Sequence, residues 1–320
     1  MVRALFYNVQ LLVPGYVDHI RAHKLRSFLI KGSWDIVALC EVYVPSLKNI
    51  LLNDELLNDI YPYRIIDLDK PKDQLYPFSG LVILSKYEIL SKKRIEFSEQ
   101  IQTLVPRLSN FRTKREILFA EINIDNQPVG VFTTHLQFGY GSARNYSRHQ
   151  QLKEIHDIVD DFWDWEKPTV ILADLNVKDN GDNYQLLRHY LPFASDWWVN
   201  LYPNRLGHTL DRANTRQIFL DNTRVDYFLG NQLIKPLGME IHKPDWSITE
   251  TEWSGELSIG AKLWLAFAFI ARLIDIPKAI LIELDRVRRG LPRRLFTDHD
   301  LSDHYPIEAE FKVQSHFQSG

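Results

Sequence analysis

The sequence has little or nothing of several features that would assign it to a familiar class. Its single cysteine, Cys40, excludes disulfide bonds within the chain and a zinc site built from several cysteines. The 38 Lys and Arg residues nearly balance the 41 Asp and Glu residues, so the charge gives no strong signal for nucleic acid. Asn8 and Gln10 interrupt the apolar residues after Met1. We therefore expect a cytoplasmic or membrane-associated protein without a signal peptide or a transmembrane helix.

The chain does have enough apolar residues, 45% of 320, to bury a large core. Apolar periodicity predicts strands at 2–9, 35–41, 63–68, 80–85, 87–97, 116–124, 129–134, 224–230 and 305–311 and within 168–176. It predicts helices at 18–31, 46–60, 142–165 and 183–189, and a loop at 192–221. Strands alternate with helices in some places and form hairpins in others. We therefore predict an α/β fold, a four-layer α/β/β/α sandwich of two mixed sheets flanked by helices, as one domain over residues 1–320.

The strand within 168–176 ends in two polar residues. Thr169 to Leu172 form an apolar run, and Asp174 and Asn176 follow it two residues apart. At a strand period of two, both side chains emerge on the same side. An oxygen-rich pair there suits a phosphate, a water molecule or a hard cation such as Mg²⁺. The alternative is an Asx-turn that closes the strand.

Three other predicted strands also carry a polar residue at or near an end. Glu41 follows an apolar strand, and its alternative role is to cap the next turn. His135 ends the strand at 129–134, where a single histidine is usually structural or on the surface. Asp226 lies within an apolar strand, so its charge needs a partner, either a histidine or a metal.

Eight polar residues at or near strand ends carry a family resemblance: Asn8, Glu41, His135, Asp174, Asn176, Asp226, Asp303 and His304. In order and spacing they resemble the endonuclease/exonuclease/phosphatase superfamily, which is similar to pancreatic deoxyribonuclease in fold. Within it the chain is most similar to bacterial neutral sphingomyelinases, on the segments 134–137, 148–155, 207–209 and 302–306. The segment 224–229 also resembles abasic-site endonucleases. One departure is that Phe78 and Ser79 stand where some relatives have an acidic residue supporting the first histidine.

The resemblance implies a divalent cation, Mg²⁺ or Mn²⁺, held against a phosphate oxygen. Glu41 would bind it with help from Asn8. Asp303 would contact the residues that bind the cation, or would bind a second metal. Its alternative role is to form a cap or a turn. His304 would be the general base on the attacking water, because a histidine titrates near neutral pH. Asp226 would orient His304 and stabilise its imidazolium form.

The remaining site residues are assigned to the substrate. Asp174 and Asn176 would position the water and the developing pentacovalent phosphorus. His135 would stabilise the phosphorane or assist the leaving oxygen. His208 lies in the predicted loop over the strand ends and would contact the substrate there.

A long segment before the last motif is predicted to be a helical, apolar and basic insertion at about 245–298. Its apolar run at 263–271 would span about 14 Å as a helix, against a bilayer core of about 30 Å, so it cannot cross a membrane. Its predicted membrane contacts are Trp253, Trp264, Phe267 and Phe269, supported by a cluster of five arginines at 286–294. The alternative is a helical hairpin packed on the domain or on a second copy.

These features predict a metal-dependent phosphodiesterase, sphingomyelinase-like, that converts sphingomyelin or a related phospholipid to ceramide and phosphocholine at a membrane surface. The alternative enzyme is a nuclease, or a phosphoinositide or sugar-phosphate phosphatase, on the same fold. The alternative outside catalysis is a membrane-binding or partner-binding module. The complete set of eight polar residues favours an enzyme.

Overall fold

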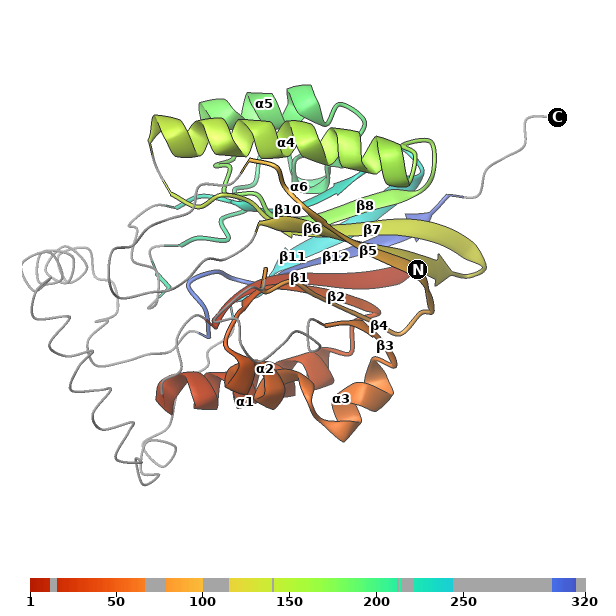
Figure 1. Cartoon of the computed structure of the whole chain (residues 1–320), viewed down its shortest axis with the longest axis vertical. Helices are drawn as coiled ribbons and strands as arrows, with labels where there is room; N and C mark the ends of the chain where they lie inside the picture. Colours follow the sequence, from red (N-terminus) through yellow and green to blue (C-terminus); the bar gives the residue numbers. More distant parts are fainter. Residues whose placement is uncertain are drawn as a thin grey trace, which may run out of the picture.

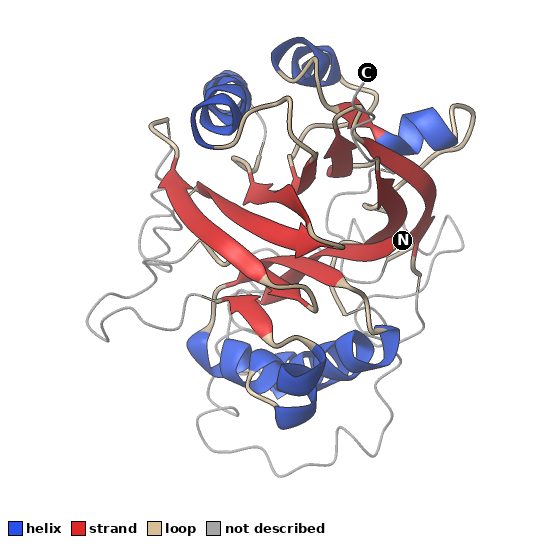
Figure 2. Ribbon diagram, turned by 90° about the vertical axis from the view of Figure 1, so that its right-hand side faces the viewer, coloured by secondary structure: helices blue, strands red, loops and turns tan. Residues whose placement is uncertain are grey.

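The computed structural model describes residues 1–11, 16–66, 79–99, 115–139, 141–211, 213–214, 222–243 and 301–314. Two six-stranded mixed sheets pack face to face (Figures 1 and 2). The first sheet has the order β11 (Ile234–Ile241), β12 (Ile307–Val313), β1 (Val2–Leu11), β2 (Ile36–Val42), β4 (Val82–Ser85) and β3 (Tyr63–Ile65). The second has the order β5 (Ile89–Glu96), β6 (Glu116–Ile124), β7 (Gln127–His135), β8 (Thr169–Asp174), β10 (Asp226–Gly230) and β9 (Ser195–Asp196).

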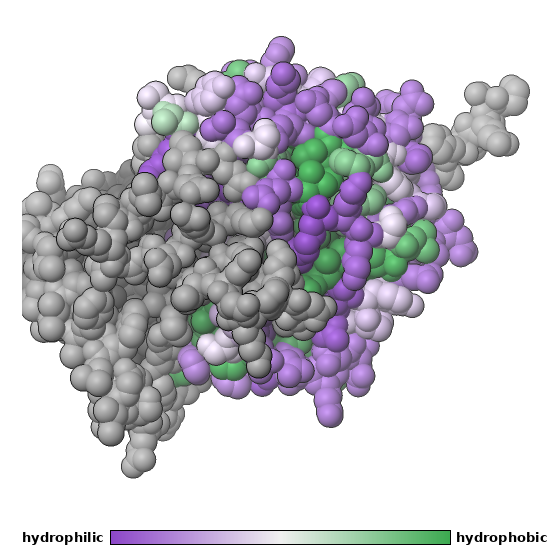
Figure 3. Space-filling model, in the orientation of Figure 1, coloured by the Kyte–Doolittle hydropathy of each residue, from purple (hydrophilic) through white to green (hydrophobic). Residues whose placement is uncertain are grey.

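Helices cover the outer face of each sheet (Figure 1). The first sheet carries α1 (Tyr16–Gly32), α2 (Pro45–Leu52) and α3 (Glu55–Ile60), and the second carries α4 (Ser142–Phe162) and α5 (Asp182–Tyr190). The short α6 (Trp197–Leu201) packs its two tryptophans into the core between the sheets. On the face seen in Figure 3 the layer of α4 and α5 is mostly hydrophilic, as expected for helices whose apolar sides face a sheet. The predicted four-layer α/β/β/α sandwich is confirmed.

The alternation along β1 explains how one strand serves two cores and the site. Ala4 and Phe6 point into the core between the sheets. Leu5 and Tyr7 point to the opposite face, into the core under α1 and α2. Asn8 continues the inward-facing series at the end of the strand, where it is buried. The strand period therefore places a polar amide at the edge of the inter-sheet core.

Two predictions of local structure were wrong, and one strand was missed. The helix predicted at 46–60 is two helices, because Asp54 interrupts it and caps α3 by accepting a hydrogen bond from Leu57 N at 3.1 Å. The loop predicted at 192–221 contains β9 and α6, and Asp196 caps α6. The strand β11 was not predicted. Its apolar side chains are interrupted by Pro236 and Gly238, where the register with β12 shifts.

The insertion predicted at about 245–298, with Trp253, Trp264, Phe267 and Phe269, lies outside the described residues and stays a prediction. In the described part of the chain, no helix combines the length and apolar character needed to cross a bilayer.

Candidate active site

Strand register brings three titratable side chains into one row across the second sheet. β7 and β8 run parallel with His135 opposite Asp174, and β8 and β10 run antiparallel with Asp174 opposite Asp226. All three residues are almost completely buried. Neighbours in register share a face of the sheet, so the two carboxylates and the imidazole meet at its edge. The sequence indicated that Asp226 lies inside a strand, but in the structure it is the first residue of β10.

The first sheet contributes Asn8 from the opposite side. Its Nδ2 donates a hydrogen bond to Oδ2 of Asp174 at 3.0 Å and lies 3.5 Å from Nε2 of His304. The Ser302 hydroxyl donates to the main-chain oxygen of Asn8 at 2.6 Å, which fixes the segment before β12 against β1. Asn8 therefore links the two sheets at the point where the site forms.

His304 and Asp226 form the shortest charged pair of the site. Nδ1 of His304 lies 2.8 Å from Oδ2 of Asp226, and its Nε2 lies 3.8 Å from Oδ2 of Asp174. Burial opposes protonation of His304, but the charges of Asp226, Asp174 and Asp303 outweigh it and raise its pKa well above 6.5. The sequence indicated that the buried charge of Asp226 needs a partner, and that partner is His304.

His135 occupies the other end of the row. Its Nε2 lies 3.7 Å from Oε1 of Glu41 and 3.5 Å from Oδ2 of Asp174. Burial, then the nearby charges of Arg115 and His304, hold the pKa of His135 well below 6.5, so the ring is neutral. Its Nδ1 has no hydrogen-bond partner among the described residues.

Arg115 is a site residue that the sequence reasoning missed. Its guanidinium donates to the main-chain oxygen of His135 at 3.2 Å and is buried. An arginine directly before an apolar strand was the available signal. Ser79, at the position where some relatives carry an acid, donates to Glu116 instead of supporting His135.

The two carboxylates nearest His135 are those of Glu41 and Asp174. Too few hydrogen-bond donors and positive charges face them to stabilise their ionised forms. Burial, then repulsion from Asp303, raises the pKa of Glu41 to about 7 despite the opposing effect of His304. Burial, then repulsion from Asp226, raises the pKa of Asp174 to about 7. A set of buried oxygens that repel one another fits a hard divalent cation, which takes carboxylate and amide oxygens. Glu41, Asp174, Asn8 and the half-buried Asp303 are the groups that would hold it.

Asn176 and the backbone complete this edge. The amide of Asn176 donates to Oδ1 of Asp174 at 2.9 Å, so the Asx-turn alternative is also present. Its Nδ2 donates to the main-chain oxygen of Leu136 at 3.1 Å, which leaves its second amide hydrogen for a ligand. Gln10, Glu41 and Asn176 have φ values of 48°, 61° and 51°, the strained left-handed region that clusters at functional sites. His208 is half-buried and has no hydrogen bond to the other site residues in the described part of the chain.

The two-sheet sandwich, with an Asp–His pair and buried carboxylates where strand ends meet, defines a class of phosphoester hydrolases. The chain belongs to the Endonuclease/Exonuclease/phosphatase family, whose model matches residues 5–304. Members of this family hydrolyse phosphoester bonds. Among curated proteins no sequence relative matches the chain.

Solved structures share the fold along their whole length. Beta toxin from Staphylococcus aureus is 19% identical with a TM-score of 0.66, covering 98% of this chain and 100% of its own. A variant of that toxin contains bound magnesium ions. D. rerio TDP2 complexed with a single-strand DNA product is 16% identical with a TM-score of 0.64. The match covers 98% of this chain and 99% of TDP2. Sphingomyelinase C from Streptomyces griseocarneus is 16% identical with a TM-score of 0.61. The match covers 96% of this chain and 98% of the sphingomyelinase. At these identities the similarity shows the fold.

Proposed function

We propose that this protein is a divalent-cation-dependent phosphodiesterase that cleaves sphingomyelin, or a related phospholipid, to ceramide and phosphocholine. The observation that carries the reaction type is the Asp226–His304 pair at 2.8 Å, beside Asp174 and Asn8 and close to Glu41. Support for the lipid comes from the sphingomyelinase-like segments of the sequence and from the shared fold with beta toxin and sphingomyelinase C.

The Asp226–His304 pair supplies proton transfer. With Nδ1 held by Asp226, Nε2 of His304 is the atom that would take a proton from the attacking water, in place of its 3.5 Å contact with Nδ2 of Asn8. A general base must be neutral, whereas three carboxylates favour the imidazolium form. Mg²⁺ or Mn²⁺ held by Glu41 would neutralise that charge and the charge of the substrate phosphate. Asp226 then stabilises the imidazolium that forms when the proton is taken.

The other residues orient the phosphate and the water. Asn176 carries a second amide hydrogen at the edge of the row, suited to a phosphate oxygen. Asp174 accepts from both Asn8 and the main chain of Asn176, which fixes its carboxylate in one orientation. Neutral His135, next to Glu41, is placed to donate a hydrogen bond to a phosphate or leaving oxygen.

A pocket beside Asn176 favours the second candidate, a nuclease or a phosphoinositide or sugar-phosphate phosphatase. It has a volume of about 260 Å³ and is lined by Arg148, Lys178, Asn145 and Asn183, with Phe138 at one side. Its described lining contains no acidic side chain. A choline group is bound best by aromatic faces, whereas cations and amides bind a second phosphate or hydroxyl groups.

One assay separates the two candidates. The protein is incubated with Mg²⁺ and, in turn, sphingomyelin, phosphatidylcholine, phosphoinositides and DNA, and the products are identified. We expect phosphocholine and ceramide from sphingomyelin, with little effect of Lys178→Gln. Release of inorganic phosphate or nucleotides, weakened by Lys178→Gln, would establish the second candidate instead. The absence of any product would contradict the enzyme itself.

We also propose that the segment 245–298 contacts the membrane, on the sequence evidence of its aromatic and arginine residues. Trp264→Ser combined with Phe267→Ser should weaken sedimentation with liposomes and hydrolysis of vesicle substrate. The same variant should cleave a short soluble phosphodiester at the normal rate. Equal loss on both substrates with early melting would instead place these rings in a packed core.

A further inference from the structure

Cys40 is a buried side chain beside the site that the proposed reaction does not use. It lies on β2 opposite Asn8 in the parallel pairing of β1 and β2, so both side chains face the second sheet. It is fully buried and is a free thiol. The sequence presented it only as the last apolar residue of a strand.

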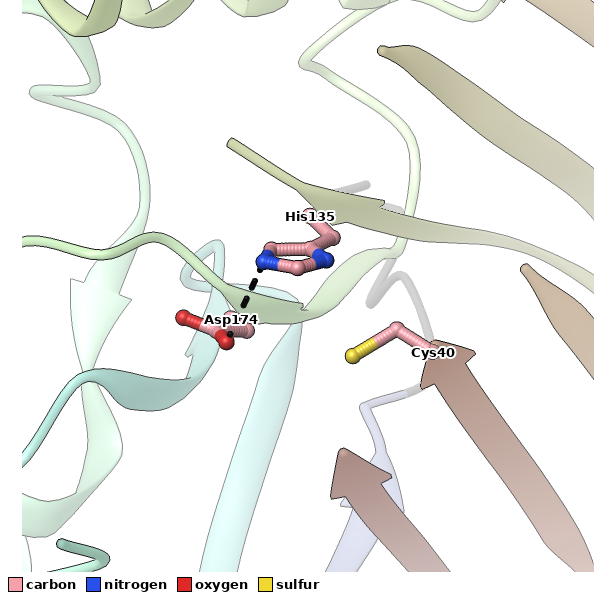
Figure 4. A group of neighbouring side chains, drawn as sticks. All are labelled: Cys40, His135 and Asp174. Atoms are coloured by element: carbon pink, nitrogen blue, oxygen red, sulfur yellow. Dashed lines mark ion pairs between the residues drawn. The ribbon is translucent and has the colours of Figure 1, made fainter. Parts of the chain in front are cut away.

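Register places this thiol against the row of the second sheet. The sulfur of Cys40, a ring nitrogen of His135 and a carboxylate oxygen of Asp174 all lie within 4.8 Å of one another. Figure 4 shows the sulfur pointing from β2 toward the second sheet, where His135 and Asp174 lie 3.5 Å apart. His135 is 3% exposed, and its Nδ1 has no partner in the described residues. A donor set of sulfur, nitrogen and oxygen thus converges on one small volume.

We propose that Cys40, His135 and Asp174 form a binding site for a thiophilic divalent cation such as Zn²⁺, which overlaps the catalytic centre and inhibits the enzyme. Thiolate, imidazole and carboxylate are the ligands that Zn²⁺ takes in proteins, whereas Mg²⁺ takes oxygen alone. Bond lengths of about 2.0–2.3 Å put the ligand atoms of a tetrahedral zinc site roughly 3.3–3.8 Å apart. With separations of up to 4.8 Å, the ligand atoms need to close by about 1.5 Å at most, which rotamer adjustment supplies.

Inhibition follows because the two cation sites share ligands and space. Asp174 belongs to both sets, and His135 lies 3.7 Å from Glu41. Zn²⁺ bound to Cys40, His135 and Asp174 would make His135 and Asp174 unavailable to the substrate phosphate. Its charge would also repel a second cation at Glu41. The thiol loses its proton to solvent as the Zn–S bond forms, so binding of the ion releases protons and weakens as the pH falls.

Cobalt spectroscopy tests the site without reference to any substrate. Co²⁺ added to the purified protein should produce a near-ultraviolet thiolate-to-cobalt charge-transfer band, which an equimolar amount of Zn²⁺ abolishes and an equimolar amount of Mg²⁺ does not. Because Cys40 is the single cysteine of the chain, such a band can come from no other residue. Cys40→Ala should lose the band. A wild-type protein that binds Co²⁺ without the band, or that shows no binding, would overturn the proposal.

A kinetic experiment tests the consequence. At saturating Mg²⁺, Zn²⁺ should inhibit wild-type phosphodiester hydrolysis, and Cys40→Ala should need at least ~10-fold more Zn²⁺ for the same inhibition. The basal rate of Cys40→Ala should be unchanged. Equal sensitivity of the two proteins would contradict the overlap. If Cys40→Ala melts early, the wild-type cobalt spectrum decides alone, and neither result depends on which phosphoester is the natural substrate.

Discussion

Two clusters of polar groups, one where the two sheets meet and one on the outer face of the first sheet, differ in how many donors and cations face their carboxylates. The site cluster, at the inner edge, contains Asn8, Glu41, His135, Asp174, Asp226 and His304. The outer cluster lies on the helix-covered face and contains Arg3, Trp34, His242 and Glu308. In the outer cluster Glu308 accepts hydrogen bonds from Arg3 Nε at 2.9 Å and Trp34 Nε1 at 2.7 Å, and lies 2.9 Å from Nε2 of His242.

The pKa values express the difference. Burial alone would raise the pKa of Glu308, but its hydrogen bonds from His242, Trp34 and Arg3 lower it to about 2. In the site cluster, burial and neighbouring acids raise the pKa values of Glu41 and Asp174 to about 7. Burial favours the neutral form of the carboxylates in both clusters, so the supply of donors and cations decides their pKa values. The outer cluster is complete without a ligand, whereas the site cluster has negative charge that a divalent cation would neutralise.

The largest expected effect separates the two histidines. His304→Ala should lower phosphodiester hydrolysis by at least the ~10²–10⁴-fold typical of a general base. His242→Ala, the matched variant of the outer cluster, should leave the rate unchanged. Rates are measured with saturating Mg²⁺, and circular dichroism checks the fold of each variant. Near-normal turnover of a folded His304→Ala protein would remove His304 from the reaction.

A matched pair of carboxylates sharpens the contrast. Glu41→Gln keeps the side-chain shape but removes its charge, so half-maximal activity should need ~10–100-fold more Mg²⁺. Glu308→Gln should leave that requirement unchanged and lower the free energy of unfolding by ~2 kcal/mol, a value reduced for solvent screening around Arg3 and His242. Magnesium titrations and urea unfolding measure the two quantities. The same change in both variants would mean that the clusters do not differ in kind.

The pH dependence of stability should have opposite signs at the two clusters. The pKa of Glu308 falls from 4.5 to about 2 on folding, so its contribution is complete above pH 4.5 and is lost as the pH falls toward 2. The pKa of Glu41 rises from 4.5 to about 7, so without a cation its charge destabilises the fold as the pH rises through that interval. In urea unfolding of the cation-free protein, Glu308→Gln should flatten the acid limb, and Glu41→Gln the limb between pH 4.5 and 7.

A modest effect is expected from the stabilisation by Mg²⁺. A cation at 100 times its dissociation constant adds about 2.7 kcal/mol to the free energy of unfolding, which raises the melting temperature of a chain of this size by roughly 5 °C. The increase should be larger at pH 8, where Glu41 and Asp174 are ionised, than at pH 5. Glu41→Gln should reduce it, and Glu308→Gln should not. An equal increase at both pH values would contradict the titration of these carboxylates.

The residues of the site cluster could be picked out of the sequence because they follow simple local rules. Asn8, Glu41 and His135 stand at or near the ends of apolar strands, and strand period and order suffice to bring such residues to one edge. The four layers follow from the same apolar patterns.

The outer cluster was not predicted, because nothing local marks it. Arg3 and Glu308 are 305 positions apart and meet only through the register of β1 and β12. Arg115 and β11 were missed for related reasons, since each depends on a partner that is distant in the chain. The proximity of Cys40 to His135 likewise depends on how the two sheets are placed, which periodicity does not specify.

The most direct measurement is hydrolysis of a soluble chromogenic phosphodiester, bis(4-nitrophenyl) phosphate, by wild type and His304→Ala. Each protein is assayed in Mg²⁺, after EDTA, and after Mg²⁺ is restored. We predict that the wild type is active, silent in EDTA and active again, while His304→Ala is inactive throughout. Full wild-type activity in EDTA, or equal activity of the two proteins, would contradict a cation-dependent phosphodiesterase site at the site cluster.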